Sequence, residues 1–397
     1  MKTTIQTTSI IFLLLVILVH PAWAQKAKTK KNAEIKIAME PGNWEYDTAS
    51  IKFITHRNVK AAYVSNGDRL FLKNHKFSNG TIEYDVELGR GFPGIVFRLS
   101  DDRKNGDNFY LRYFGGASSA ENRTTLQYAA IIDDMSIWDL TDEYQSGATL
   151  NLSGWNHVKL VISGKQMKAY VNDMNRPALI VPELEGGLSN GHIFFFGGQV
   201  TIANLVLRPD VVEDLPAAPG YISTCNDTRY LRHWKVSAAR TLPQGKDIVL
   251  ALPYMGGTPA KPELPDSTTR WTTIHAENRG MVNLTRNFGH VEKTERRLAW
   301  LKTTIVSDRI QERTLNLGFS DEIWLFVNGQ LLYIDKNHFG TPAQKFPGGR
   351  CTIENTTIKL PLQQGNNEIL IGLTNYFYGW GIIARLDDVD GVHFPRE

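Results

Sequence analysis

Short runs of alternating apolar and polar residues, separated by Gly, Asn, Asp or Pro, follow one another along most of the chain. A two-residue period places successive side chains on opposite faces of a β-strand, and it differs from the 3.6-residue period of an amphipathic helix. Frequent turn residues between short strands are typical of antiparallel sandwiches. The sequence therefore predicts an all-β protein, with strands at residues 81–88, 94–99, 109–113, 125–131, 157–163 and 168–172.

The clearest hairpin lies in the second half, where residues 322–328 and 330–335 flank the dipeptide Asn328-Gly329. Asn and Gly tolerate the positive φ that a tight hairpin turn requires. Residues 253–270 are rich in Pro and Gly and predict a long surface loop. Long loops on a sandwich are common locations for binding residues.

The 397 residues exceed what one hydrophobic core usually organises, so we expect two domains. Residues 209–220 contain three prolines and no alternating pattern, which is typical of a linker. We therefore expect two jelly-roll β-sandwiches joined by this Pro-rich linker. The predicted division is a signal peptide at 1–24, a basic flexible tail at 25–32, a first sandwich at 33–208, a linker at 209–221 and a second sandwich at 222–397.

The first residues predict a secretory signal peptide. Lys2 precedes a wholly apolar run at residues 10–19, which is too short to span the ~30 Å of a bilayer as a comfortable helix. Ala22 and Ala24 supply the small residues of a cleavage site. Cleavage near Ala24 predicts a secreted or periplasmic protein. No later apolar run is long enough to span a bilayer, so we expect no membrane insertion.

The formal charge of +3 comes largely from the chain's first residues. Five lysines precede residue 32, and without them 39 of the 44 basic residues remain against 41 acidic ones. Nucleic-acid binding requires a concentrated basic face, and no Lys/Arg stripe follows residue 31. We therefore expect no nucleic-acid partner. The oligomeric state and the host are not specified by the sequence.

Residues 33–208 resemble a concanavalin A-like lectin/glucanase domain, related to laminin-G modules and keto-disaccharide hydrolase-like domains. The resemblance lies in FSNGTIEYDVEL, GFPGIVFRL, DNFYLRY, WNHVKLVISG followed by AYVND, and GGQVTIANLVLRP. Residues 222–392 resemble a galactose-binding-like jelly-roll module, through RHWKVS, LNLGFSDEIWLFVNGQLLY, LPLQQGNNEILIGLTN and GWGIIARL. Such domains bind or cleave glycans, or brace a neighbouring domain.

The strongest candidates for catalytic residues are Glu83, Asp85 and Glu87. The glucanases that the first half resembles use a Glu-x-Asp-x-Glu strand to present a nucleophile and an acid. Alternation places all three carboxylates on one strand face, as a retaining pair at ~5 Å separation requires. Their position argues against catalysis, because the catalytic strand of such glucanases comes later in the chain. Ordinary solvent exposure of charged residues is the competing interpretation.

Alternation also predicts a polar and aromatic binding face in the first half. Tyr110 and Arg112 alternate with apolar neighbours, as Arg98 does on the preceding strand, so they could share one sheet face. Guanidinium groups bind hydroxyls and carboxylates, and aromatic rings stack on sugars. Surface arginines paired with acids are the alternative. The next strand can add either Gln127 or Tyr128 to this face, and Trp138 lies in a polar stretch. The binding candidates are therefore Arg98, Tyr110, Arg112, Gln127 or Tyr128, and Trp138.

Three aromatic residues of the second half, Tyr376, Tyr378 and Trp380, fall at alternate positions. If this stretch is extended, their rings line one face as a stacking platform, with Tyr376 and Tyr378 as ligand-binding candidates. Packing into the sandwich core explains the same spacing and is favoured for Trp380.

Cofactor and metal motifs are absent from the sequence. There is no Walker loop, no H-E-x-x-H and no pair of C-x-x-C motifs, so no metal or cofactor is assigned, and structural calcium has no Asp-rich loop to support it. Cys225 and Cys351 are the only cysteines. Export would permit a disulfide between them, and their separation in the sequence leaves that pairing open.

Three classes of function follow from these features. The first is an exported carbohydrate-binding protein, in the setting of a polysaccharide-utilisation system. The second is a glycoside hydrolase or related hydrolase of the concanavalin-like class, acting through Glu83, Asp85 or Glu87. The third is a structural or adhesive protein whose sandwiches contact another protein, which a large exposed apolar patch would favour.

Overall fold

The computed structural model describes residues 34–65, 67–113, 119–249, 263–290 and 295–395. The predicted signal peptide, the basic tail and residues 253–262 of the predicted long loop lie outside the described residues. Residues Ala33–Glu397 form one compact unit, to which the following description applies. In the described part of the chain, no helix is long and apolar enough to cross a membrane.

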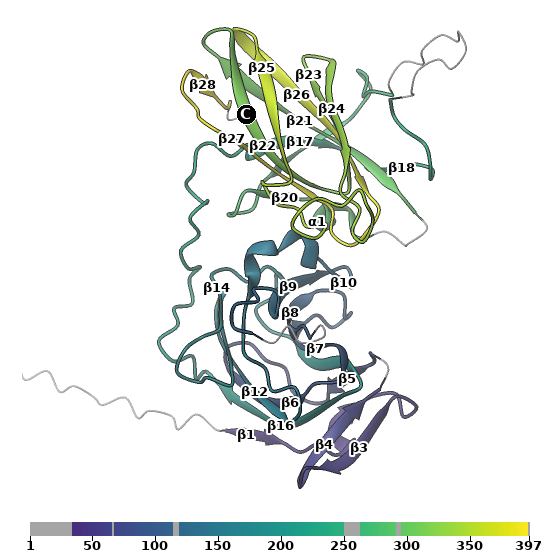
Figure 1. The fold of residues 1–397 in the computed structure, drawn as a ribbon, viewed down its shortest axis with the longest axis vertical. Coiled ribbons are helices and arrows are strands. Elements are labelled where there is room, and N and C mark those ends of the chain that lie inside the picture. The colour runs from purple at the N-terminus through teal and green to yellow at the C-terminus, as the bar shows by residue number, and fades with distance from the viewer. Residues whose placement is uncertain (1–33, 66, 114–118, 250–262, 291–294, 396–397) are drawn as a thin grey trace, which may run out of the picture. The chain divides into compact units, whose positions relative to one another are not determined.

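The first half folds into a sandwich of two antiparallel sheets, here called the first sandwich (Figure 1). The strands of sheet A are β1 (Ile35–Ile37), β3 (Ile51–His56), β4 (Val59–Val64), β6 (Gly80–Glu87), β12 (Trp155–Ser163), β13 (Gln166–Val171), β14 (Leu179–Val181) and β16 (Val200–Pro209). The strands of sheet B are β2 (Trp44–Glu45), β5 (Arg69–Leu72), β7 (Arg90–Leu99), β8 (Gly106–Leu111), β9 (Leu126–Ile132), β10 (Met135–Ser136), β11 (Gln145–Ser146) and β15 (His192–Gly198). Three short 3₁₀ helices are η1 (Pro41–Asn43), η2 (Trp138–Leu140) and η3 (Asp142–Tyr144).

The order of strands is β14-β13-β12-β6-β16-β4-β3 in sheet A and β10-β9-β8-β7-β15-β5-β2 in sheet B, with β1 paired to β16 and β11 to β9. Alternation gives both sheets a shared core. Ile82 and Tyr84 of β6 pack in the same apolar cluster as Phe109 of β8 and Phe195 of β15. The predicted strands of the first half are confirmed, with bounds that differ by a few residues.

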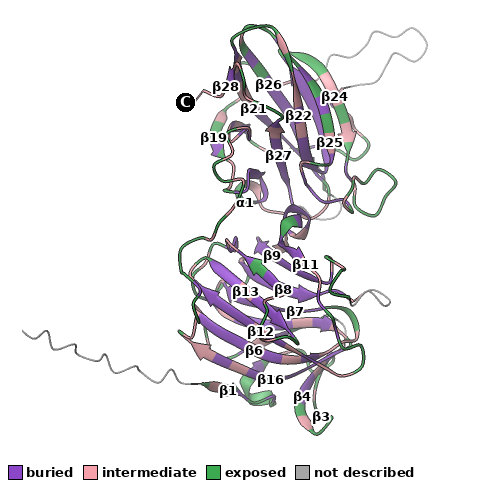
Figure 2. Ribbon diagram, turned by 60° about the vertical axis from the view of Figure 1, so that its left-hand side comes forward, coloured by how far each residue is buried: buried purple, intermediate pink, exposed green. Residues whose placement is uncertain are grey.

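Sheet B is buried on both of its faces at β8 and β9, as Figure 2 shows by their purple colour. One face packs into the core. On the other face, Gly94 of β7 lies opposite Phe196 of β15 and Tyr110 of β8 in the strand register. A Cβ atom at Gly94 would lie 2.4 Å from Phe196 Cζ and 2.7 Å from Tyr110 Cβ. The absence of a side chain at Gly94 therefore leaves room for the Phe196 ring beside Tyr110 Cβ.

Replacing Gly94 by Ala is expected to destabilise the protein by about 1–3 kcal/mol, because the added methyl group overpacks this face. Urea unfolding measures the loss of stability. A control Gly42→Ala variant, whose Cβ meets nothing within 4 Å, should change stability much less; equal losses in both variants would contradict the packing argument.

The second half forms a second sandwich of two antiparallel sheets. The strands of sheet C are β17 (His233–Ser237), β18 (Arg240–Thr241), β19 (Trp271–His275), β21 (Arg297–Ser307), β23 (Glu322–Val327), β24 (Gln330–Lys336), β26 (Gly365–Asn375) and β28 (Val392–His393). The strands of sheet D are β20 (Met281–Asn283), β22 (Gln311–Ser320), β25 (Thr356–Leu362) and β27 (Gly381–Leu386), and α1 (Thr285–Phe288) follows β20. Sheet C runs β19-β17-β21-β26-β23-β24, with β18 and β28 paired to β21, and sheet D runs β20-β27-β22-β25.

The predicted hairpin is confirmed as β23 and β24. Asn328 and Gly329 both have positive φ, at 51° and 78°, so the dipeptide forms the tight turn that the sequence predicts. The buried carboxylate of Glu322 begins β23 and accepts hydrogen bonds from Arg296 Nε at 2.7 Å and Thr374 Oγ1 at 3.0 Å. Burial alone would raise the pKa of Glu322, but His338, whose Nε2 lies 3.3 Å from Glu322 Oε1, and the hydrogen-bonded Arg296 outweigh it and lower the pKa to about 2.

We expect Glu322 to contribute to acid denaturation. Its folded-state pKa is depressed, so its contribution is present above the unfolded pKa near 4.5 and is lost as the pH falls towards about 2. Urea unfolding between pH 7 and pH 2 should show this loss in the wild type. A Glu322→Gln variant should start less stable at neutral pH, because Arg296 stays buried without its charge partner, and should depend less on pH. An unchanged pH slope would contradict this role.

The two sandwiches pack against each other through a small apolar cluster. Ala130, Ile137 and Leu140 of the first sandwich contact Met281 and Ile383 of the second within one buried group. Gln166 Nε2 donates to the carbonyl oxygens of Pro216 and Ala218, at 3.1 and 2.7 Å, so part of the Pro-rich segment lies against the first sandwich.

A buried ion pair also joins the two sandwiches. Arg279, in the turn between β19 and β20, donates from Nε to Glu185 Oε1 at 2.7 Å and from Nη1 to Glu143 Oε1 at 3.1 Å. The side chains of Arg279 and Glu185 are only 5% and 7% exposed. Burial raises the pKa of the Glu185 carboxyl, while the charge of Arg279 opposes that shift.

Candidate functional site

A row of side chains crosses the outer face of sheet B, away from the sandwich core. The strand register places Phe196 opposite Gly94, Gly94 opposite Tyr110, Tyr110 opposite Gln127 and Gln127 opposite Gln145. Residues paired across neighbouring strands lie on the same face. Pairing of β8 with β9 therefore gathers the polar groups that the sequence predicted at Tyr110 and Gln127.

The amide oxygen of Gln127 is the centre of a hydrogen-bond network. Gln127 Oε1 accepts from Tyr110 Oη at 2.9 Å, from Arg350 Nη2 at 3.1 Å and from Arg112 Nη2. Arg112 also donates to Gln145 Oε1 and to Tyr110 Oη, each at 2.8 Å. One neutral oxygen thus orients two guanidinium groups, of which Arg112 extends from β8 and Arg350 belongs to the second sandwich.

Aromatic rings stand above this network. The Trp138 ring, at the start of η2, meets Phe339 edge-on with centroids 4.9 Å apart and Tyr378 with centroids 5.6 Å apart. The Arg350 guanidinium lies over the Trp138 ring at 4.7 Å, and Arg350 Nη1 donates to the Trp138 carbonyl oxygen at 2.7 Å. Phe339 and Phe377 stack with centroids 5.6 Å apart. The second sandwich therefore supplies one wall of the site.

The loop that carries Phe377 and Tyr378 is held by a buried carboxylate. Asp321 Oδ2 accepts from the backbone N–H groups of Tyr376 and Phe377, at 2.6 and 2.7 Å. Asp139, directly after Trp138, accepts from the Gly379 N–H at 3.0 Å. Burial raises the pKa of Asp139 to about 6. These contacts fix the aromatic wall relative to η2.

These side chains enclose a cavity of roughly 480 Å³, here called the aromatic pocket. Its volume falls in the range of about 300–1,000 Å³ that small-molecule sites occupy. Apolar surface dominates, with a few convergent hydrogen-bonding groups. The described residues that line it are Phe92, Asn108, Tyr110, Arg112, Thr124, Ser136, Trp138, Phe196, Phe339, Gly348, Arg350, Phe377 and Tyr378.

Burial shifts the pKa values of the polar lining groups. Desolvation raises the pKa of Tyr110 to about 12, so its hydroxyl stays protonated near neutral pH. Desolvation also lowers the pKa of Arg112, and desolvation together with the charge of Arg112 lowers the pKa of Arg350 to about 10. Both arginines remain positively charged at neutral pH. Asn108 is 4% exposed, and its Oδ1 atom has no hydrogen-bond partner among the described residues.

Five of the sequence candidates meet at this pocket or directly beneath it: Tyr110, Arg112, Gln127, Trp138 and Tyr378. Tyr128 does not join them. Its ring packs into the sandwich core and its hydroxyl donates to Asp107 Oδ1 at 2.7 Å. Because neighbouring residues on a strand point to opposite faces, Gln127 rather than Tyr128 faces the pocket.

Arg98 also lies elsewhere, which corrects the expectation of a shared face with Tyr110. Arg98 has a φ of 51°, which interrupts the alternation of β7, and the pairing of β7 with β15 is irregular near this point. Its guanidinium donates to the carbonyl oxygens of Ser78 and Gly164, both at 2.8 Å. These bonds fix Arg98 between loops of the first sandwich.

The predicted platform of Tyr376, Tyr378 and Trp380 is wrong, because the stretch is not extended. Tyr378 has a φ of 53° and Asp321 binds the two preceding N–H groups, so the chain turns between β26 and β27. Tyr376 stacks on His338 at 4.8 Å, Tyr378 faces Trp138, and Trp380 is fully buried in the core of the second sandwich.

The candidate carboxylates Glu83, Asp85 and Glu87 share one face of β6, as predicted, but each is paired with a basic group. Asp85 Oδ1 lies 2.7 Å from His157 Nδ1, Glu83 binds Arg208, and Glu87 Oε2 accepts from Arg57 Nε at 2.7 Å. These partners lower the pKa of each carboxyl. A general acid needs a raised pKa, so this face of sheet A does not provide one.

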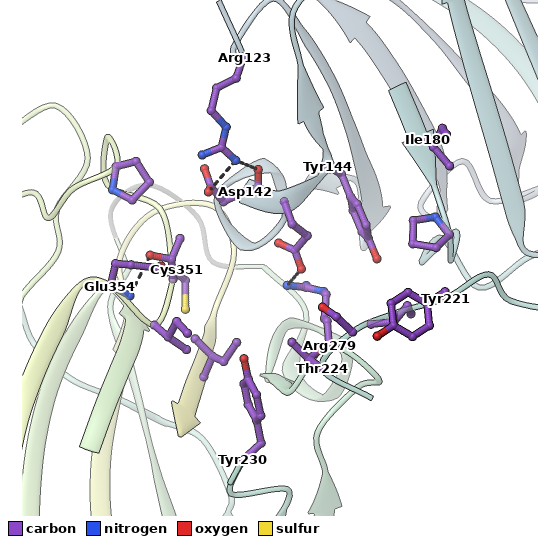
Figure 3. A pocket seen from close by; sticks show the side chains of 18 of the residues that line it. Arg123, Asp142, Tyr144, Ile180, Tyr221, Thr224, Tyr230, Arg279, Cys351 and Glu354 are labelled. Atoms are coloured by element: carbon purple, nitrogen blue, oxygen red, sulfur yellow. Dashed lines mark hydrogen bonds and ion pairs between the residues drawn. The ribbon is translucent and has the colours of Figure 1, made fainter. Parts of the chain in front are cut away.

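Cys225 and Cys351 are both free thiols, so the disulfide that the sequence left open is not formed. Cys351 is buried beside Met281, with its Sγ 3.9 Å from the Met281 Sδ, whereas Cys225 is exposed. Cys351 lines a second cavity of roughly 580 Å³, shown in Figure 3 with Tyr144 and Tyr221 on the opposite side. The charged group at its centre, Arg279, is already bound by carboxylates. Among the described residues, no cluster of three or more His, Cys, Asp or Glu side chains could hold a metal ion.

Several pocket residues were not selected from the sequence. The alternation that identifies Tyr110 also places Asn108, two positions earlier on β8, on the same sheet face. Phe196 reaches this face through the register of β15 with β7. Arg350 and Phe339 lie in an irregular segment after β24 and have no periodic signal. Their approach to sheet B depends on how the two sandwiches pack.

The fold and the pocket define an all-β chain of two sandwiches with an aromatic, arginine-containing cavity. No protein-family model and no curated protein matches this sequence. Solved structures similar to part of this chain include carbohydrate-binding module CBM66 from Bacillus subtilis, at 16% identity and a TM-score of 0.31, covering 42% of this chain and 95% of the module.

A Bacillus subtilis protein of unknown function with a galectin-like fold is also similar, at 12% identity and a TM-score of 0.31, with coverage of 44% of this chain and 98% of that one. The Bacillus licheniformis β-glucanase has 8% identity and a TM-score of 0.31, with coverage of 46% and 100%. Because each of these TM-scores lies below 0.5, these likenesses carry no argument about this chain, and its function is argued from the chemistry of the site.

Proposed function

We propose that this protein is exported and binds carbohydrate in the aromatic pocket. The observation that supports this most is the combination of aromatic rings and fixed hydrogen-bond donors around one cavity. The rings of Trp138, Phe92 and Phe377 can pack on the apolar faces of a sugar. Arg112 and Arg350 supply donors for sugar hydroxyls, and Asn108 adds a buried amide oxygen that has no hydrogen-bond partner among the described residues.

The pocket is preorganised for this role. Gln127, Tyr110 and Gln145 hold the guanidinium of Arg112 before any ligand arrives, and Asp321 and Asp139 hold the opposite aromatic wall. Preorganisation lowers the entropy that binding must overcome. Nothing in the pocket resembles a catalytic acid pair, because the described charged residues that line it are arginines. Binding without cleavage is therefore the function that the geometry favours.

A panel of soluble and insoluble polysaccharides tests the proposal. The chain without its predicted signal peptide, residues 25–397, is incubated with each polysaccharide, and both retention of the protein and release of reducing sugar are measured. We expect retention without release. Release of reducing sugar would show hydrolysis instead, and the absence of retention on every member would contradict the proposed function.

A further inference from the structure

The described charged side chains that line the aromatic pocket are all positive. Among the described residues that line it, the charged groups are Arg112 and Arg350, and no carboxylate is included. These residues are 7% and 6% exposed, so both guanidinium groups have lost most of their water. Burying a charge is costly unless a group of opposite charge or strong hydrogen bonds replace the water.

The partners of these two arginines are mostly neutral. Arg112 donates to the oxygens of Gln145, Tyr110 and Gln127, and Arg350 donates to the Trp138 carbonyl and to Gln127. A guanidinium has five N–H donors, so both groups retain donor capacity beyond these bonds. Their charges also face the same small cavity, where each disfavours the charged form of the other.

The carboxylates near the arginines are engaged elsewhere. Asp142 Oδ1 lies 3.6 Å from Arg350 Nε, but the same oxygen accepts from Gln145 Nε2 at 2.7 Å, and Asp142 Oδ2 accepts from Arg123 at 3.1 Å. Asp139 accepts from Gly379 N–H and from Ser320 Oγ at 3.2 Å. Neither carboxylate lines the pocket, so among the described residues two buried positive charges face its interior with no anionic side chain between them.

We propose that the pocket selects sugars that carry an anionic substituent, a carboxylate or a sulfate ester, held between Arg112 and Arg350 while the ring packs on the aromatic walls. Guanidinium groups bind such oxygens through short, charge-assisted hydrogen bonds. This inference rests on the proposed function, because it names the class of sugar bound at the same pocket. Asn108 and Tyr110 remain available for the sugar hydroxyls.

The test compares matched glycans in a direct binding assay. The panel contains uronate polymers, the same polymers after reduction of their carboxylates to hydroxymethyl groups, sulfated polysaccharides and neutral polysaccharides. We expect binding to an acidic member and a loss of about tenfold or more in affinity for its reduced counterpart. Preference for uronate or for sulfated members identifies which anion is bound. Equal or tighter binding of the reduced or neutral members would overturn the inference while the proposed function stands, and binding of no glycan would overturn both.

Two variants test whether the two arginines of the pocket bind the anionic group. Arg112→Met and Arg350→Met should each weaken binding of the acidic glycan about tenfold or more and reduce its dependence on salt, because one charge-assisted contact is lost. Arg112→Lys keeps the charge and serves as a second variant if Arg112→Met is poorly folded. Arg240→Met, which removes an exposed arginine paired with Glu263, is the matched control and should bind as the wild type does. Unchanged affinity for the acidic glycan in a folded Arg350→Met variant would contradict the assignment.

Discussion

Replacing Arg279 by Met is expected to lower the free energy of unfolding by about 3–5 kcal/mol, because a buried ion pair loses one partner. Arg279 and Glu185 are almost fully buried and hydrogen bonded at 2.7 Å. Without Arg279, the carboxylate of Glu185 stays in a low-dielectric interior, and its pKa rises further. Urea unfolding at neutral pH, followed by circular dichroism, measures the loss.

The pH dependence of this variant gives a second test. The pKa of Glu185 is raised to about 8 in the wild type, and loss of the Arg279 charge raises it further. Below that pH, Glu185 makes the same pH-dependent contribution in both proteins, so the deficit of Arg279→Met relative to the wild type should change little between pH 4.5 and pH 7 and should grow as the pH rises above about 8. Adding Glu185→Gln should recover part of the loss, since the two positions interact directly. A deficit below about 1 kcal/mol, the level of an exposed pair, would contradict the role of Arg279.

Replacing Trp138 by Ala is expected to weaken glycan binding by about a hundredfold or more, as at other central aromatic contacts. Trp138 contributes a ring to the pocket, contacts Phe339 and Tyr378, and lies beneath the Arg350 guanidinium. Removal of the ring opens the pocket to water and removes the aromatic surface on which the Arg350 guanidinium lies. Affinity measured by isothermal titration against the best glycan of the panel reports the effect.

Controls for Trp138 separate the pocket from general unfolding. Trp138→Phe retains an aromatic ring and should lose less affinity than Trp138→Ala. The double variant Glu83→Gln/Glu87→Gln alters the outer face of sheet A and should bind glycan as the wild type does. If Trp138→Ala is folded and binds with unchanged affinity, carbohydrate does not occupy this pocket.

Local sequence patterns predicted the sheet face of the pocket well. Side chains alternate between the two sheet faces along β8 and β9, and that alternation placed Tyr110 and Gln127 on one face once the register was known. The class of fold follows from the same pattern, because apolar residues at every second position must be buried against a second sheet.

Local patterns failed where the backbone leaves the regular period. Arg98 and Tyr378 both have positive φ, so their side chains point away from the direction that alternation predicts. No single-sequence signal marks such a position for a residue other than Gly or Asn. Arg350 was missed for a different reason, since its contact with Gln127 joins residues that are 223 positions apart and depends on the packing of two sandwiches.

The aromatic pocket has two structural origins, a sheet from the first sandwich and loop residues from the second. The sheet side is fixed by strand pairing, whereas Phe339, Arg350 and Tyr378 lie between strands. Substitutions or insertions in loops are tolerated better than changes in paired strands. Ligand preference can therefore diverge through the second sandwich alone, by exchange of these loop residues, while the sheet that carries Arg112 and Gln127 stays unchanged. A library confined to the loops around positions 339, 350 and 378 would accordingly be the economical starting point for redirecting this chain to other glycans.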